Sequence, residues 1–141
     1  MRSDAWDKTE PAPAFGVGVP DGEYVARLLS VTEKQFKNGR EGLEWYWEVI
    51  SKGPENGKVI VQVSGLSTEQ NLAFLKRDMK ALGVDVSLPW ERAFSDLQAK
   101  AGTAAVLQVL SKAGFQNVYI RRAAGPEDME NASELGREVP F

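Results

Sequence analysis

Aromatic and basic side chains occur together in two parts of this sequence. The first part holds Lys34, Phe36, Lys37, Arg40, Trp45, Tyr46 and Trp47, and the second holds Lys112, Phe115 and Arg121. An aromatic ring can stack on a nucleic-acid base, and a cation can follow the phosphates of the same strand. These residue types therefore predict a surface that binds single strands without reading their sequence.

Several reactive groups are missing from the chain, which contains no histidine and no cysteine. It therefore has no imidazole base, no thiol nucleophile, no disulfide and none of the usual zinc ligands. Glu44 and Glu48 are a carboxylate pair, but no acid–base partner, metal-ligand cluster or nucleophile motif accompanies them. We expect no enzymatic activity, no metal site and no cofactor.

The charges are distributed unevenly, although the net charge is −3. Residues 22–122 hold fourteen basic and eleven acidic residues, whereas residues 123–141 hold one basic and five acidic residues. A mildly basic body is compatible with a polyanionic ligand, because phosphate attraction depends on local charge. The sequence predicts three parts: a flexible leader over 1–21, a folded domain over 22–122 and a disordered acidic tail over 123–141.

The spacing of apolar residues predicts the elements of the domain. Period-two alternation indicates strands over 22–34, 43–50 and 58–66, and the Asn38-Gly39 pair favours a hairpin between the first two. Helical spacing follows from a cap at Ser67 to a stop at Gly83, and a second short helix is predicted over about 90–100. Two further strands are expected over 103–111 and 115–122.

This order predicts a mainly β fold, a five-stranded OB-fold barrel with a helix between strands three and four. An SH3-like barrel would not normally hold a long helix at that place, and a ferredoxin-like fold needs a helix after its first strand. In an OB barrel, the surface of strands two and three and the loops beside it bind oligonucleotides. The residues named above lie on or around those strands and loops, except Arg121, which is expected at the end of strand five.

The orientation of the second strand stays open at this stage. If Leu43 and Val49 mark the core side, Trp45 and Trp47 are buried and Tyr46 is the exposed ring. If the strand twists or bulges, Trp47 reaches the surface instead. Three further rings stand at helical positions, and we expect them to pack the helices onto the barrel: Phe74, Trp90 and Phe94.

The chain ends in an acidic residue followed by an aliphatic residue, proline and phenylalanine: Glu138, Val139, Pro140 and Phe141. This end resembles the tip of bacterial single-stranded DNA-binding proteins, although Arg137 interrupts the acidic run. The body is also similar to small phage single-stranded DNA-binding proteins. That similarity is carried by Pro20-Asp21-Gly22-Glu23-Tyr24, Asn38-Gly39, Leu43-Glu44-Trp45-Tyr46-Trp47-Glu48-Val49, Gly57-Lys58 and Asn117-Val118-Tyr119-Ile120.

The resemblance implies a protein that coats and protects single-stranded DNA and recruits replication or recombination enzymes through Phe141. An OB-type protein–protein module without DNA binding, and a strand-annealing or recombination mediator, are the alternatives. A monomer and a homo-oligomer are both compatible with the sequence. No stretch is long and apolar enough to span a membrane and no signal-peptide pattern is present, so we expect a cytoplasmic protein, in the host cytoplasm if phage-encoded.

Overall fold

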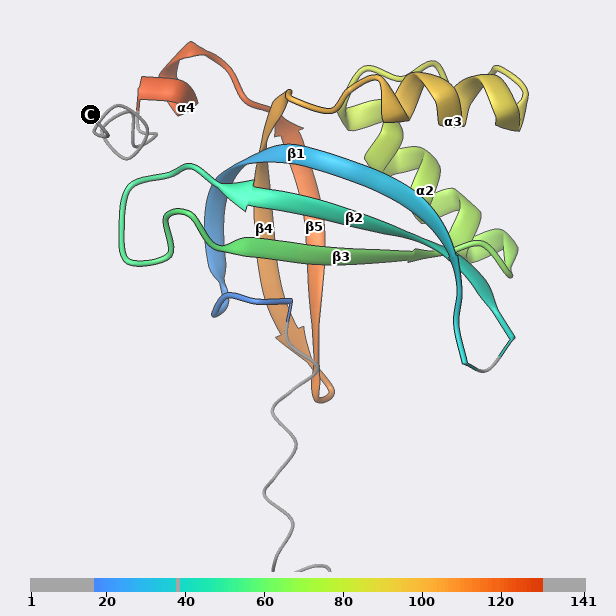
Figure 1. The fold of residues 1–141 in the computed structure, drawn as a ribbon, viewed down its shortest axis with the longest axis horizontal. Helices are drawn as coiled ribbons and strands as arrows, with labels where there is room; N and C mark the ends of the chain where they lie inside the picture. Colours follow the sequence, from blue (N-terminus) through green and yellow to red (C-terminus); the bar gives the residue numbers. More distant parts are fainter. Residues whose placement is uncertain (1–16, 38, 131–141) are drawn as a thin grey trace, which may run out of the picture.

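The computed structural model describes residues 17–37 and 39–130 (Figure 1). Five antiparallel strands form one sheet in the order β3-β2-β1-β4-β5. The strands are β1 (Gly22–Gln35), β2 (Glu41–Val49), β3 (Val59–Gly65), β4 (Ala104–Lys112) and β5 (Phe115–Ala123). The predicted mainly β architecture with five strands is confirmed. In the described part of the chain β3 and β5 are not paired with each other, so the sheet is open between them.

The first strand is the middle strand of the sheet, with β2 on one side and β4 on the other. Its first half, from Gly22 to Arg27, pairs with β4, and the part from Ala26 to Gln35 pairs with β2. The register with β2 shifts between Leu28 and Ser30, and this irregularity bends the strand. A strand of 14 residues can therefore curve around two sides of the core, as its mixed apolar faces predicted.

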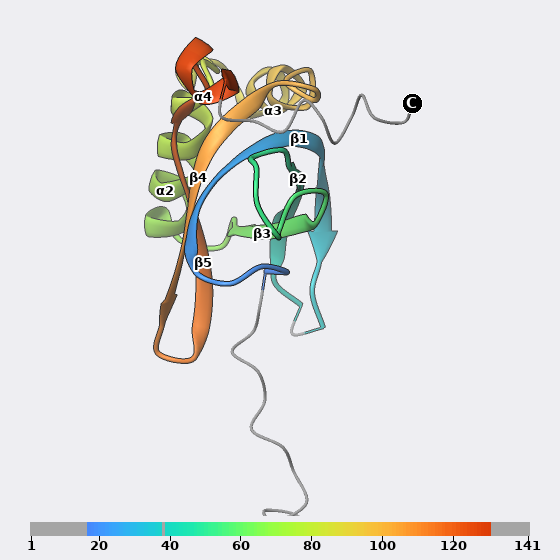
Figure 2. The ribbon, with the colours of Figure 1, turned by 90° about the vertical axis from the view of Figure 1, so that its left-hand side faces the viewer.

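A short segment before β1 lies across the open side of the sheet, between β3 and β5 (Figures 1 and 2). The Val61 N–H donates to the Val17 carbonyl at 2.8 Å, and the Gln116 side chain bonds both the Val17 N–H and the Val19 carbonyl, each at 2.9 Å. Val17 and Val19 are buried. The leader predicted over 1–21 is therefore wrong for residues 17–21, which belong to the folded body.

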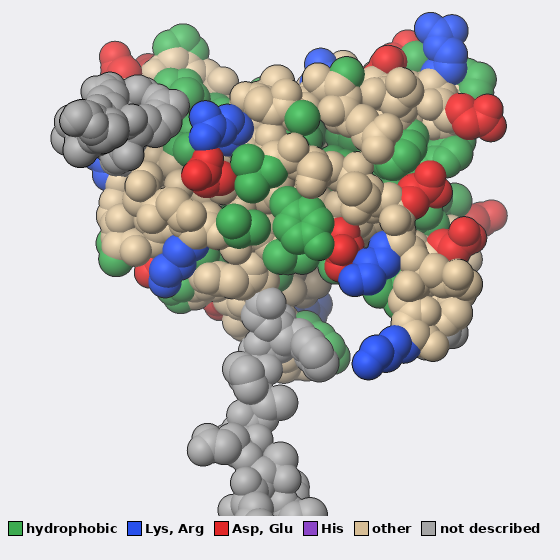
Figure 3. Space-filling view, in the orientation of Figure 1, with side chains coloured by type: hydrophobic (Ala, Val, Ile, Leu, Met, Phe, Trp, Pro, Cys, Tyr) green, Lys and Arg blue, Asp and Glu red, His purple; other side chains and the backbone are tan. Residues whose placement is uncertain are grey.

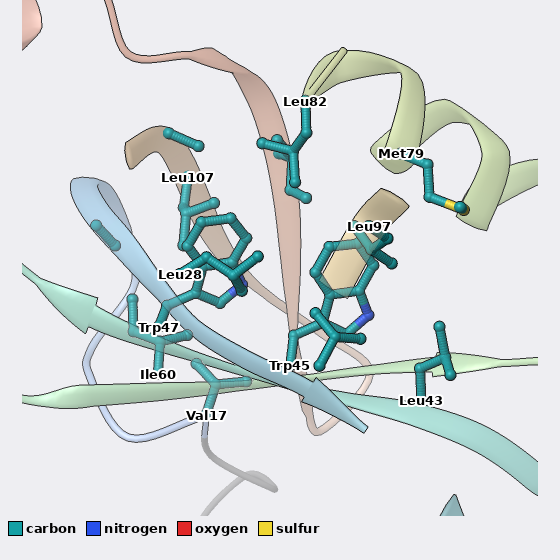
Figure 4. Packing of buried hydrophobic residues seen from close by; sticks show 14 of the residues in the cluster. Val17, Leu28, Leu43, Trp45, Trp47, Ile60, Met79, Leu82, Leu97 and Leu107 are labelled. Carbon is teal, nitrogen blue, oxygen red and sulfur yellow. The ribbon is translucent and has the colours of Figure 1, made fainter. Parts of the chain in front are cut away.

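The core is built around two tryptophan rings (Figure 4). Trp45 and Trp47 are fully buried, and their rings stack with centroids 6.2 Å apart and an angle of 9° between the planes. Each indole N–H donates at 2.9 Å to a side chain of β3: Trp45 to Ser64 and Trp47 to Gln62. Because both polar groups are satisfied inside, burial of these rings carries no unpaired donor.

Among the residues that the structure describes, three helices lie outside the sheet: α2 (Glu69–Ala81), α3 (Trp90–Gln98) and α4 (Pro126–Glu130). Helix α2 contacts both β3 and β5, so it covers one end of the open side (Figure 1). Its cap is Thr68, whose hydroxyl accepts the Asn71 N–H at 3.0 Å; the cap predicted at Ser67 is wrong by one residue. None of the described helices is long and apolar enough to cross a membrane.

Helix α4 was not predicted, because residues 123–141 were expected to have no regular structure. Ala124 and Met129 pack on a small second cluster formed by Val25, Ile50 and Val106. The Asp128 carboxylate accepts the Gly125 N–H at 2.8 Å, which fixes the first turn of the helix. The folded body therefore extends to residue 130.

Candidate nucleic-acid interface

A groove runs along the open side of the sheet, between the edges of β3 and β5. We call it the seam groove; its volume is about 740 Å³. Its sides are formed by β3 and β5, and one end is formed by α2. The side chains with rings or charge that line it are Phe74, Arg77, Asp78, Lys112, Phe115 and Tyr119.

The seam groove combines three aromatic rings with two cations. The rings of Phe74 and Phe115 are 46% and 53% exposed, respectively, and Tyr119 is half-buried. The Arg77 guanidinium lies 5.1 Å from the Phe74 ring centroid and 5.7 Å from the Tyr119 ring centroid. It is therefore held between the two rings by cation–π attraction while about half of its side chain stays in contact with water. Lys112 stands at the end formed by the β4–β5 hairpin.

A buried carboxylate forms part of the lining of the seam groove. Asp78 of α2 is 4% exposed and accepts a hydrogen bond from Gln62 Nε2 at 3.2 Å. Gln62 in turn accepts from Trp47, so one polar chain joins α2, β3 and the core of β2. Burial raises the pKa of Asp78 to about 6, although Arg77, the Ile120 backbone N–H and Gln62 all favour its charged form.

The outer face of β1, β2 and β3 borders the groove, and its charges are paired (Figure 3). Lys34 Nζ lies 3.0 Å from Glu44 Oε2, and Arg27 pairs with Glu48 across β1 and β2. The Tyr46 hydroxyl donates to Glu44 at 2.7 Å. This bond, followed by Lys34, lowers the pKa of Glu44, and the same bond raises the pKa of Tyr46.

The pairing bears on the predicted role of Tyr46 as a stacking platform. Tyr46 is half-buried, and it lies opposite Val61 of β3 on the outer face. Its two acidic neighbours, Glu44 and Glu48, would repel phosphates if their charges were unpaired. Each carboxylate forms an ion pair with a different cation of β1, which reduces that repulsion.

The β1–β2 hairpin carries the other predicted cations. Lys37 and Arg40 are exposed at its tip, and Lys34 Nζ lies 5.9 Å from the Phe36 ring centroid. The Phe36 ring is half-buried because it lies against the backbone of Gly42, where a Cβ would come within 2.5 Å of its edge. An apolar ring in a basic loop is thus covered by the protein itself.

The structure brings some predicted residues together and separates others. Lys112 and Phe115 line the seam groove, whereas Arg121 is exposed outside it and bonds the Gln108 side chain. The expectation that Trp45 and Trp47 contact DNA is wrong, because both rings are fully buried in the core.

Sequence reasoning missed three groove residues: Phe74, Arg77 and Tyr119. Phe74 was expected to pack a helix onto the barrel, yet nearly half of its surface is exposed. A ring and an arginine three positions apart share one helix face, so the Phe74–Arg77 spacing was an available signal. The predicted docking residues Glu138, Val139, Pro140 and Phe141 lie outside the described residues. No protein-family model matches the sequence, and a search of curated proteins finds no significant similarity.

Proposed function

We propose that this protein binds single-stranded DNA without sequence preference, with the seam groove as the centre of the interface. The observation that carries the proposal is the group of three accessible rings, Phe74, Phe115 and Tyr119, beside the cations Arg77 and Lys112. Bases stack on such rings whatever their sequence, and cations between them attract the phosphates that link the bases.

The interface continues from the groove onto the outer strand face. Val61 and Val63 line the groove, and across the sheet they lie opposite Tyr46 and Glu44, respectively. A strand that leaves Phe115 can therefore pass over β3 to Tyr46 and then reach the cations of the β1–β2 hairpin. An OB barrel uses two such loops and such a strand surface for oligonucleotides.

We also propose that the fold is an OB-type barrel, as the resemblance to phage single-stranded DNA-binding proteins implies. The strand order β3-β2-β1-β4-β5 and a helix between β3 and β4 are compatible with the Greek-key barrel. Closure between β3 and β5 would run through residues 17–19, which bond both strands. Helix α2 covers one end of this closure.

Recruitment of replication or recombination enzymes is assigned to the chain end at Glu138-Val139-Pro140-Phe141. A phenylalanine side chain can fill an apolar pocket of a partner, and Glu138 can meet basic residues around that pocket. Phe141→Ala should then weaken partner capture and leave DNA binding unchanged. Equal loss of both activities would contradict this division of roles.

The proposal is tested by fluorescence anisotropy of a labelled oligothymidine, at low and moderate salt, with unlabelled duplex as competitor. We expect binding that resists the duplex and weakens with salt. Tryptophan fluorescence is a poor reporter here, because Trp45 and Trp47 are fully buried in the core. No anisotropy change at micromolar protein would overturn the proposal and favour a protein–protein module.

A ring variant locates the interface. Phe115→Ala should weaken oligothymidine binding by about 5- to 150-fold, because one base–aromatic stack is worth about 1–3 kcal/mol. Leu110→Ala removes an apolar side chain that is 43% exposed on β4 outside the groove, and it should change binding by less than about twofold. Equal effects of the two variants would place the DNA elsewhere.

Faster pairing of complementary strands in the presence of the protein would identify an annealing protein.

A further inference from the structure

A second groove lies on the other side of α2, between α2, the following loop and the first turn of α3. We call it the helix groove; its volume is about 730 Å³. Leu75 and Met79 form its buried floor, and Leu72 and Trp90 stand on its walls with 40% and 38% of their surfaces exposed. Two large apolar side chains therefore meet water beside an apolar floor, which marks a surface suited to a partner.

The charge on the helix groove is opposite in sign to that of the seam groove. Three exposed carboxylates line it, those of Glu33, Glu41 and Glu69, against one cation, Lys76. None of the ion pairs formed among residues 17–37 and 39–130 includes any of the three. An acidic lining repels phosphates and attracts Lys or Arg, so this groove disfavours nucleic acid and favours a basic ligand.

The shape of the helix groove favours a helical ligand. One wall follows α2 from Glu69 to Met79, about three turns or roughly 15 Å. The two strand residues that line it are Glu33 of β1 and Glu41 of β2. A helix can lay an apolar stripe between α2 and α3 along this wall.

We propose that the helix groove binds an amphipathic basic helix of a partner protein. Leucine-like side chains spaced i, i+3, i+4 and i+7 would cover Leu72, Leu75 and Trp90, and Lys or Arg on the flanks would face the three carboxylates. The chain's own ends match this chemistry poorly. Residues 1–16 carry three carboxylates, two cations and two prolines, and residues 131–141 carry two carboxylates and one cation.

The test uses the full chain with Ala73→Cys, which introduces a single cysteine at an exposed position lining the helix groove. An environment-sensitive dye on this cysteine reports binding of a synthetic three-turn peptide with leucine at the stripe positions and lysine elsewhere. We expect saturable binding in the micromolar range. A peptide with glutamate in place of every lysine, and a scrambled lysine peptide, should each bind at least tenfold more weakly.

Two variants test whether the dye signal reports binding in the helix groove. Leu72→Asp should reduce peptide affinity at least tenfold. Because this change adds negative charge, the loss would not come from a weaker general attraction between the protein and the lysine peptide. The triple change of Glu33, Glu41 and Glu69 to Gln should reduce affinity at least fivefold at low salt. Val63→Asp, the same kind of change at a 56% exposed residue of the seam groove, is the matched control and should leave peptide binding intact.

Several outcomes would overturn the proposal. Equal binding of the lysine and glutamate peptides, or unchanged binding by Leu72→Asp, would show that the helix groove is not a basic-helix site. A nitroxide on the cysteine of the Ala73→Cys variant that broadens the resonances of residues 1–16 would identify the chain itself as occupant. Protection of the same thiol that grows with protein concentration would identify a second copy. If the protein fails to bind DNA, the proposal for the helix groove still stands, because the two assays use different ligands and different grooves.

Discussion

At the scale of single residues, Asp78 stands out because it is an acidic side chain held inside the body. Its Oδ1 atom lies 3.8 Å from Arg77 Nε and has no hydrogen-bond partner among the described residues, while Oδ2 accepts from Gln62. Desolvation is the largest influence on its pKa, which rises from 3.8 to about 6. The charged form of Asp78 is therefore less favourable in the folded protein than in the unfolded chain.

The raised pKa predicts how stability depends on pH. Between about pH 4 and pH 6 the folded protein holds a proton on Asp78 that the unfolded chain has lost, so this group's contribution to the free energy of unfolding falls as pH rises. It is constant below and above this window, and the total change is about 3 kcal/mol. Asp78→Asn removes the titration. The difference in unfolding free energy between variant and wild type, from urea titrations, should therefore rise across the window; parallel curves would contradict the assignment.

Gly42 is a second residue whose identity follows from its surroundings. A Cβ at this position would lie 2.5 Å from Phe36 Cε2 and 2.8 Å from the Ser64 carbonyl oxygen. Gly42→Ala should therefore lower the free energy of unfolding by about 1–3 kcal/mol, because the ring and the β2–β3 pairing must both shift. Urea unfolding measures this loss. In the Phe36→Ala background the same substitution should cost less, since only the carbonyl contact remains, and an unchanged cost would contradict the ring contact.

At the scale of elements, the segment 17–19 is held to the sheet largely by one side chain. Gln116 of β5 bonds the Val17 N–H, the Val19 carbonyl and the Asp21 carboxylate, each at 2.9 Å. These bonds join the segment to β5, and the Val61 N–H joins it to β3. The attachment of this segment, called the crossing below, should therefore depend strongly on Gln116.

Gln116→Ala tests that dependence. It should lower the free energy of unfolding by about 1–3 kcal/mol, because a part-buried N–H loses its acceptor. It should also speed hydrogen exchange at the Val61 amide, whose partner is the Val17 carbonyl. Gln108→Ala on the neighbouring strand is the matched control, since the side chain of Gln108 accepts only from the exposed Arg121 among the described residues. Equal effects of the two substitutions on Val61 exchange would contradict the role of Gln116.

The elements show what the sequence could and could not reveal. Alternation placed all five strands within a few residues, because each strand has one face on the core. The crossing at 17–19 left no periodic signal, since its two buried valines flank a glycine and its bonds come from a residue almost a hundred positions away. Helix α4 was missed for a similar reason: five residues are too few to establish a helical period.

The candidate site was harder to predict than the fold, because orientation decides which rings are accessible. Sequence placed Trp45, Tyr46 and Trp47 on one strand and left open which of them faces outward, whereas the structure buries both indoles, which donate to Ser64 and Gln62. The groove rings come from two elements that are distant in the sequence, α2 and β5. Their proximity depends on how α2 packs across the open side, which no local pattern encodes.

At the scale of the whole molecule, charge is separated between two sides of α2. Arg77 faces the seam groove with Lys112, whereas Glu69 faces the helix groove with Glu33 and Glu41. With Asp78 counted against Arg77 and Lys112, and Lys76 counted against the three glutamates, the seam groove is basic and the helix groove is acidic. A polyanion and a basic helix would approach different faces of the body, so the two proposed ligands need not compete.

The salt dependence of DNA binding reports how many phosphates the cations of the seam groove contact. Each phosphate contact on a single strand contributes about 0.7 to the slope of log affinity against log salt. The double variant Arg77→Gln with Lys112→Gln should therefore reduce that slope by about 1.4 and weaken binding at low salt. The double variant Arg92→Gln with Lys52→Gln removes the same net charge from exposed residues outside both grooves. An equal change in slope would show that only total charge matters.

The crossing at residues 17–19 also has a consequence for the order in which the fold is completed. Val17 bonds a side chain 99 positions later in the sequence, in the last strand of the sheet. During synthesis, this segment leaves the ribosome well before β5 exists, and its partner on β3 alone offers a single backbone bond. The earliest described residues must therefore wait for the latest strand, so closure of the body is a non-local and comparatively slow step.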